Sequence, residues 1–227
     1  MTDTRPDWRE SGHGRAVHRI YLGYAPGVGK TLAMLVEARR LKSLGEDVVV
    51  GYIEPHTRPG TMALVHDFES VAPRVVVYRG NAFTELDADA IIARRPGLAL
   101  IDELAHANVP GSAHDKRWQS VEVILEAGID VFSTLNVQHL DCMSDFVYQV
   151  SGVRVAETVP RVVLDDAEVV VVDADPDELL DRVRQGSVLA PDEVGIALTH
   201  FFRKPMLMAL RDQALAFGRP DASDRDR

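Results

Sequence analysis

The chain has 227 residues, 46% of them hydrophobic and 26% charged, with a formal net charge of −10 at pH 7. This composition is typical of a globular protein with a substantial core. The negative charge disfavours nucleic-acid binding, and the single cysteine excludes a disulfide framework or a multi-cysteine zinc site. No apolar run approaches the ~20 residues that span a bilayer, and the N-terminal stretch lacks an apolar signal core. We therefore expect a cytoplasmic protein without direct membrane insertion.

Short apolar segments alternate with amphipathic ones along most of the chain. We expect strands at 17–24, 48–53, 74–78, 98–101 and 129–135, and helices at 30–44, 62–71, 87–95, 118–127 and 138–150. The first of these helices is expected to bury Leu32, Leu35, Val36 and Ala38. After residue 152 we expect one strand (169–172) and three helices (176–185, 191–202, 205–217). The alternation predicts an α/β fold, with a mostly parallel sheet, helices on both faces and a C-terminal helical appendage.

Changes in composition divide the chain into four expected parts. These are a disordered segment (1–15), a nucleotide-binding core (16–152), an appendage packed on the core (153–218) and a disordered tail (219–227). Residues 157–193 hold eleven acidic and three basic side chains, which is −8 of the net −10. Such a stretch is usually a solvated face, and the alternative is a docking surface for a basic partner.

The first expected strand leads into a glycine-rich loop that ends in Gly29-Lys30-Thr31. This ending closely matches the P-loop, Gly-x-x-x-x-Gly-Lys-[Ser/Thr], and it stands between a strand and a helix as the motif requires. The fold is therefore expected to be P-loop NTPase-like. Lys30 would reach the β- and γ-phosphates of ATP and take part in catalysis, and Thr31 would give a hydroxyl ligand to Mg²⁺. The expected nucleotide-binding residues of the loop are Pro26, Gly27, Val28, Gly29, Lys30 and Thr31.

One position of the loop departs from the motif. Tyr24 stands where the first glycine is expected, and Gly23 lies one residue too early. Tyr24 fits if its backbone is extended and its ring lies beside the nucleotide or in the core. A glycine-rich turn that binds no ligand is the alternative reading of the loop.

A second motif follows Lys30 by 72 positions, where four apolar residues lead into Asp102 and Glu103. In a parallel sheet, such a strand delivers its last residues to the edge where ligands bind. Asp102 is the expected second Mg²⁺ ligand, and Glu103 is placed as a general base toward an attacking water. After a P-loop, this Walker B-like string supports a nucleotide site.

The next strand and the loop before it supply further candidates. Thr134 or Asn136 would sense the γ-phosphate or the water, whereas capping of the following helix by Asn136 is the alternative. The polar segment 104–117 is either a switch-like loop or a surface loop. The sequence leaves open whether Lys116 or Arg117 acts on a phosphate, in cis or in a neighbouring subunit. The chain has no Asn-Lys-x-Asp string, which favours ATP over GTP.

Several longer strings resemble the N-terminal domain of the KdpD family of potassium- and turgor-responsive sensor histidine kinases. They are GYAPGVGKTLAML (23–35), DVVVGYIE (47–54), DELAHANVPGS (102–112), AGIDVFSTLNVQHL (127–140) and GVRVAETVP (152–160). The resemblance covers roughly residues 16–217 and implies a cytosolic ATP-binding regulatory module. The family's nucleotide-binding positions correspond here to Gly27, Gly29, Lys30, Thr31 and Asp102.

The function that these observations predict is an ATP-binding input domain of a potassium-sensing two-component system, with slow or partner-stimulated, Mg²⁺-dependent ATP hydrolysis. The resemblance implies a protein partner, which would be a sensor kinase, a response regulator or a potassium pump component. The sequence has no Asp-x-Gly-x-Gly kinase box, so we expect no histidine kinase activity from a short form or excised domain. The alternatives are a P-loop kinase of small molecules and a module that binds nucleotide without hydrolysing it.

Overall fold

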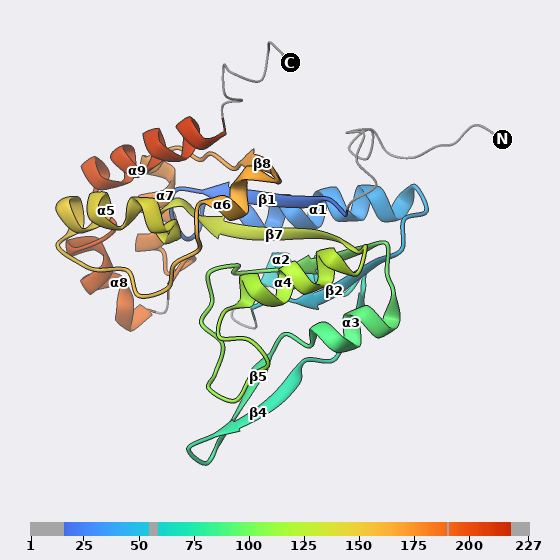
Figure 1. The fold of residues 1–227 in the computed structure, drawn as a ribbon. Helices are drawn as coiled ribbons and strands as arrows, with labels where there is room; N and C mark the ends of the chain where they lie inside the picture. The colour runs from blue at the N-terminus through green and yellow to red at the C-terminus, as the bar shows by residue number, and fades with distance from the viewer. Residues whose placement is uncertain (1–15, 55–58, 190, 219–227) are drawn as a thin grey trace, which may run out of the picture. The chain divides into compact units, whose positions relative to one another are not determined.

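The computed structural model describes residues 16–54, 59–189 and 191–218, and Figure 1 shows its fold. The main sheet has the strand order β3-β2-β6-β7-β1-β8. Its strands are β1 (His18–Gly23), β2 (Val48–Tyr52), β3 (Glu69–Ser70), β6 (Leu98–Ile101), β7 (Asp130–Asn136) and β8 (Ala167–Val171). Strand β2 runs parallel to β3 and to β6, and β6 runs parallel to β7. The predicted α/β fold with a mostly parallel sheet is confirmed, and the P-loop NTPase type is compatible with it.

Helices follow most of the strands. They are α1 (Lys30–Ser43), α2 (Pro59–Val65), α3 (Ala88–Arg94), α4 (Arg117–Glu126), α5 (Ser144–Ser151), α6 (Val162–Asp165), α7 (Pro176–Arg184), α8 (Pro191–Thr199) and α9 (Lys204–Phe217). Two short 3₁₀ helices, η2 (Val137–His139) and η3 (Asp141–Met143), precede α5. Strands β6 and β7 are buried at every position, which explains the uninterrupted apolar run of β6. Strand β7 also buries polar residues, which are Asp130, Ser133, Thr134 and Asn136.

The chain divides into two compact units, which we describe one at a time. Among the described residues, the first unit contains 16–19 together with those in Met34–Ser133, and the second contains Ile20–Ala33 together with those in 134–218. The domain boundaries expected from the sequence, 16–152 and 153–218, stay a prediction. The segments 1–15 and 219–227, expected to be disordered, lie outside the described residues.

In the first unit, α3 packs against α4, and a separate antiparallel hairpin joins β4 (Arg74–Tyr78) to β5 (Asn81–Glu85). Figure 1 shows this hairpin extending away from α3 and α4. The strand expected at 74–78 therefore forms, but it pairs with β5 and not with the main sheet. The helix expected at 62–71 ends at Val65, because the chain then turns into β3 and bonds along β2.

In the second unit, α7 packs against α8 and α9, and α9 also packs against β8 and η2. Figure 1 shows these C-terminal helices gathered with α5. The continuous helix expected at 138–150 is interrupted, because Leu140 adopts an extended backbone and bridges Val159. The three helices expected after residue 175 all form, each within a few residues of its predicted bounds.

Helix α1 begins at the predicted residue, but its buried face differs from the expected one. Met34, Leu35, Ala38 and Leu41 are buried, at the three- and four-residue spacing of a single helical face. Leu32 and Val36 are exposed instead. The sequence assigned them to the core because they are apolar, but the turn of the helix rotates both away from that face.

Candidate functional site

Close packing shapes the glycine-rich loop where it leaves β1. A Cβ atom on Gly23 would lie 2.6 Å from the Val28 side chain and 2.9 Å from that of Lys30, so the loop folds back over the end of the strand. No side chain fits at residue 23 without displacing those neighbours. The glycine that stands one residue early in the motif is therefore needed here for close approach.

Two further glycines give the loop its turn. Gly27 and Gly29 have φ values of +90° and +107°, in the left-handed region that side chains disfavour. A Cβ atom on Gly29 would meet no other atom within 4 Å. The loop is thus open beside Gly29, and this open side, with the lysine that follows, fits a phosphate group.

Lys30 is positioned by the end of a different strand. Its ammonium donates to Oδ1 of Asn136, with Nζ and Oδ1 2.6 Å apart, and more weakly to the Ala25 carbonyl at 3.4 Å. Asn136 is buried at the end of β7, and its side chain makes no capping bond to η2. The structure therefore brings these two predicted site residues together, and the capping alternative does not describe Asn136.

Tyr24 lies in the core, which is one of the two positions expected for it. Its side chain is 1% exposed, and its hydroxyl donates to the carbonyl of Ala174 at 3.0 Å. Burial, assisted by the nearby carboxylate of Asp173, raises the pKa of Tyr24 to about 12. The residue stays a neutral hydrogen-bond donor at physiological pH, and it joins the loop to the segment before α7.

The second predicted motif lies in the first unit. Asp102 is buried at the end of β6, and exposed Glu103 adopts a left-handed backbone with φ of +54°. This conformation is uncommon outside glycine and is strained for a side chain of this size. The roles predicted for Asp102 as a metal ligand and Glu103 as a base stay predictions, as does the Mg²⁺ role of Thr31, which belongs to the second unit.

Arg117 supports the backbone around that motif from inside the first unit. Its side chain is completely buried, and Nη1 donates to the carbonyl of Asp102 at 3.0 Å and to that of Glu103 at 3.4 Å. Its guanidinium also lies 4.0 Å from the centre of the Tyr52 ring and 3.7 Å from the buried carboxylate of Glu85. Arg117 is thus an internal support, and the hypothesis that it acts on a phosphate does not fit its burial.

Glu85 organises the polar loop between β6 and α4. Its carboxylate accepts from the backbone N–H of Val109 at 2.8 Å and contacts the ring of His106 at 3.1 Å. An isolated bridge between Ala107 and Lys116 closes the loop near its base. Sequence reasoning missed Glu85, since it lies on a strand that the sequence did not predict and no local pattern marks it as buried.

A metal site made only of protein side chains is absent from the described part of the chain, where no three or more His, Cys, Asp or Glu residues cluster suitably. This does not count against the predicted magnesium. Mg²⁺ commonly binds through one or two protein oxygens, with waters and substrate phosphates completing its shell. The predicted ligands Thr31 and Asp102 each carry a side-chain oxygen, the donor type that Mg²⁺ prefers, and their metal-binding role stays a prediction.

Fold and loop together define a class: α/β proteins with a mostly parallel sheet and a lysine-bearing glycine loop between the first strand and the first helix. A family model described as "Osmosensitive K+ channel His kinase sensor domain" matches residues 14–218. The chain belongs to this family, KdpD.

Curated relatives carry the same family name. The chain is 50% identical over 204 residues to the "Putative sensor protein KdpD" of Synechocystis, covering 89% of this chain and 55% of the relative. It is 50% identical over 198 residues to the "Sensor protein KdpD" of Escherichia coli K12, covering 87% of this chain and 22% of the relative. The Mycobacterium tuberculosis sensor protein KdpD is 48% identical over 198 residues, 23% of its length. The chain thus spans between about a fifth and about half of these relatives. Among its described helices, none is long and apolar enough to cross a membrane.

Proposed function

We propose that this domain binds Mg·ATP at the loop 23–31 and acts as a nucleotide-dependent input module of a potassium-responsive two-component sensor. The observation that carries the proposal is the contact between Lys30 and Asn136, 2.6 Å long, beside a loop turned by two left-handed glycines. Asn136 is a neutral acceptor, so this bond orients the ammonium without cancelling its charge. A cation held in this way is suited to meet a phosphate.

The loop would bind the phosphates mainly through its backbone. The N–H groups of residues 27–31 and the N-terminus of α1 favour an anion, and Lys30 adds a full positive charge. Thr31 and Asp102 are the proposed ligands of Mg²⁺, which would neutralise phosphate charge when bound. Glu103 is the proposed base that orients a water. Slow hydrolysis would suit a regulatory domain, because the ATP-bound form would then persist long enough to act on a partner.

The partner follows from the family. Relatives of this chain are named sensor proteins and extend well beyond the matched segment. We propose that this domain acts on the kinase portion of such a sensor, on its response regulator or on a potassium pump component. An exchange between nucleotide-bound and nucleotide-free forms would change the surface that this partner contacts.

Calorimetric titration of Mg·ATP tests the binding site. Lys30→Ala should weaken the affinity roughly 10- to 100-fold, because a charge-assisted hydrogen bond contributes about 1.5–3 kcal/mol. Lys42→Ala is the matched control, since Lys42 is an exposed lysine in the last turn of the same helix. Equal affinities of the Lys30→Ala variant and the parent protein would refute the proposed site.

Phosphate release distinguishes hydrolysis from binding alone. If Glu103 is the base, Glu103→Gln should lower the rate about 10²-fold or more while ATP still binds. Equal release from both proteins would support a module that binds without hydrolysing. Consumption of ATP that rises when a small acceptor is added would favour the small-molecule kinase alternative.

A further inference from the structure

Three contacts join the glycine-rich loop to the segment 174–188, and the proposed function uses none of them. The Tyr24 hydroxyl donates to the carbonyl of Ala174 at 3.0 Å. Nη1 of Arg182 donates to the carbonyl of Gly27 at 3.1 Å. Apolar side chains from α7 and from the turn after it pack directly over Gly27. All of these residues belong to the second unit.

The packing over Gly27 leaves no free space. A Cβ atom there would lie 2.8 Å from both methyl groups of Val188 and 3.0 Å from Cδ1 of Leu179. Close-packed groups of this kind do not deform continuously, so they move together or separate. A change in the backbone at Gly27 must therefore displace α7 or break this contact.

Arg182 fixes the direction of a peptide group in the loop. In a trans peptide, the carbonyl and the following N–H point in opposite directions. Because Arg182 holds the Gly27 carbonyl toward α7, the N–H of Val28 points away from α7. A phosphate in the loop would contact the N–H of Val28. The orientation of this N–H thus depends on the side chain of Arg182, which lies 155 residues beyond Gly27 in the sequence.

Helix α7 is also connected to the rest of the C-terminal region. It packs against α8 and α9, and ion pairs tie the start of α9 to Asp177 and the middle of α9 to Asp173. The side-chain oxygen of Asp175 caps α7 by accepting from the N–H groups of Asp177 and Glu178. A displacement of α7 would therefore also move α8 and α9, because the three helices pack together.

We propose that α7 is the element of this domain that responds to the occupant of the glycine-rich loop, and that Arg182 is the positioning residue that links the two. This inference rests on the proposed function, since it takes a nucleotide phosphate as the occupant. Linkage requires the effect to be reciprocal. Phosphate binding stabilises the packed position of α7, and loss of the Arg182 contact weakens phosphate binding.

Hydrogen exchange with and without Mg·ATP, combined with calorimetry, tests the proposal. Arg184→Ala is the matched control, because Arg184 lies on the same helix and pairs with Asp181. In the parent protein and in this control, Mg·ATP should slow exchange of the α7 amides several-fold. In Arg182→Ala, ATP should still protect the loop amides, but its affinity should fall about 5- to 50-fold and the protection of α7 should be lost.

Two results would overturn the proposal. One is equal ATP affinity and equal α7 protection in Arg182→Ala and Arg184→Ala. The other is protection of the loop without protection of α7 in the parent protein, which would leave the proposed function intact. Absence of protection at the loop itself would refute the proposed function, and this inference with it. If Arg182→Ala does not fold, Arg182→Met, which keeps most of the apolar stem but has no N–H donor for the Gly27 carbonyl, serves for the same comparison.

Discussion

Arg117 is completely buried, yet its charge is surrounded by groups that favour it. Glu85 and Glu54 lie 3.7 and 3.8 Å from the guanidinium, and the face of the Tyr52 ring lies 4.0 Å away. Removing such a cation takes a counter-charge away from the buried carboxylate of Glu85, which costs more than the pair itself contributes. Because Arg117 also holds the carbonyl of Glu103, it maintains the left-handed backbone that follows β6.

The first prediction concerns the stability that this cation provides. Arg117→Met keeps most of the apolar volume, and we expect it to lower the free energy of unfolding by about 3–5 kcal/mol, because Glu85 loses its buried counter-charge. Urea unfolding followed by circular dichroism measures the change. Arg39→Met is the control, since the ion pair of Arg39 with Asp67 is exposed and such pairs contribute little. If the urea midpoint of Arg117→Met differed from that of the parent protein no more than the midpoint of the control does, this account would be contradicted.

The residues of the candidate site differ in how far the sequence could predict them. The motif itself marks Lys30 and Thr31, and the end of a strand marks Asn136. Nothing local marks Arg182, whose contact with the loop spans 155 positions. The sequence leaves open whether Arg117 acts on a phosphate, and only the fold shows that its side chain is internal. Contacts that depend on tertiary packing produce no periodic pattern in the sequence. For that reason the sequence does not predict the positions of Arg117 and Arg182.

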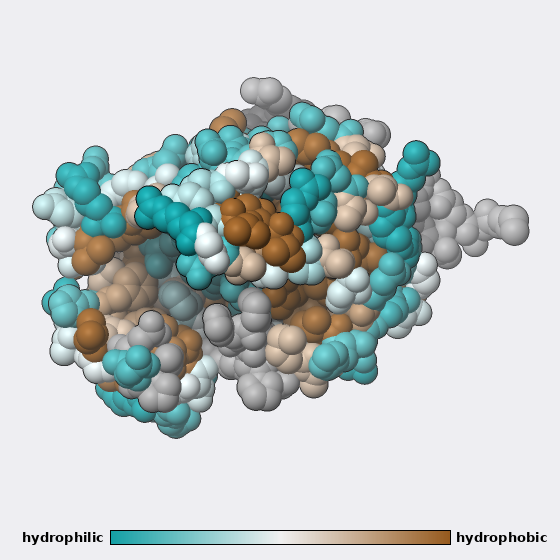
Figure 2. Space-filling model, turned by 90° about the horizontal axis from the view of Figure 1, so that it is seen from below, coloured by the Kyte–Doolittle hydropathy of each residue, from teal (hydrophilic) through white to brown (hydrophobic). Residues whose placement is uncertain are grey.

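At the level of elements, the β4–β5 hairpin presents two different faces. Val75 and Val77 are 63% and 70% exposed, and Thr84 and Ala82 stand opposite them. Figure 2 shows apolar side chains gathered over this hairpin. On the other face, Val76 is partly covered and approaches the loop at Gly111.

The second prediction follows from this difference between the faces. Val77→Lys should change the free energy of unfolding by less than about 0.5 kcal/mol, because the side chain is already in solvent. Val76→Lys should cost more, about 1–2 kcal/mol, because it places a charge on the covered face. Chemical denaturation of both variants checks the prediction. A larger loss for Val77→Lys than for Val76→Lys would show that the faces are assigned the wrong way round.

The elements that the sequence predicted best are those with the strongest burial. Strand β6 is covered at every position, so its apolar run LALI identifies it without further context. Strand β7 is equally covered, and its apolar residues Val131, Phe132 and Leu135 mark it although polar residues stand between and beside them. Strand β5 was missed, because four of its five residues are exposed and NAFTE carries no alternation. The sequence also does not predict that the helix expected at 138–150 is interrupted. The interruption comes from the bridge between Leu140 and Val159, a contact with a distant segment that helical periodicity cannot indicate.

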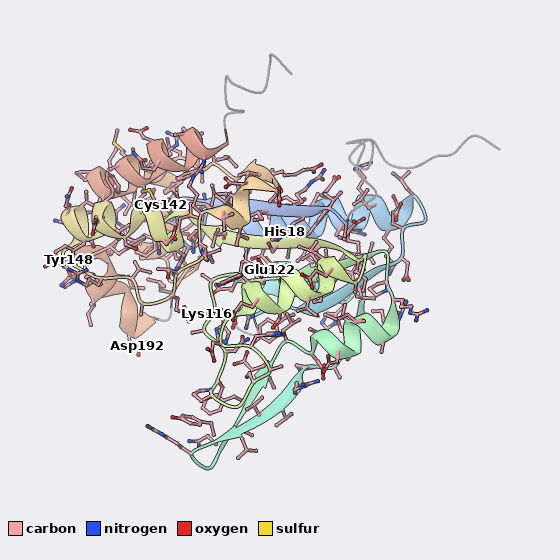
Figure 3. All side chains as sticks on the ribbon, in the orientation of Figure 1. His18, Lys116, Glu122, Cys142, Tyr148 and Asp192 are labelled. Atoms are coloured by element: carbon pink, nitrogen blue, oxygen red, sulfur yellow. The ribbon has the colours of Figure 1, made fainter. Side chains whose placement is uncertain are left out.

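At the scale of the whole molecule, buried histidines make folding depend on pH. His18, labelled on β1 in Figure 3, is 5% exposed and shares a 2.8 Å hydrogen bond with Ser133. Burial lowers the pKa of His18 to about 3. Burial also lowers the pKa of His139, whose Nδ1–H donates to the carbonyl of Glu157 at 2.8 Å. Both rings are therefore neutral in the folded protein under conditions in which the unfolded chain takes up protons.

The third prediction gives the sign of this dependence. As the pH falls below about 6.5, the unfolded chain binds a proton at His18 and the folded protein does not, until the pH approaches 3. The free energy of unfolding should thus fall with decreasing pH, and the contribution of His18 should reach a slope of about 1.4 kcal/mol per pH unit. Urea unfolding between pH 7.5 and 4.5 measures it. His18→Gln, which keeps a hydrogen-bonding side chain, should show a shallower slope, because the contribution of His18 is removed. Equal slopes in the two proteins would mean that His18 is protonated in the folded state as readily as in the unfolded one.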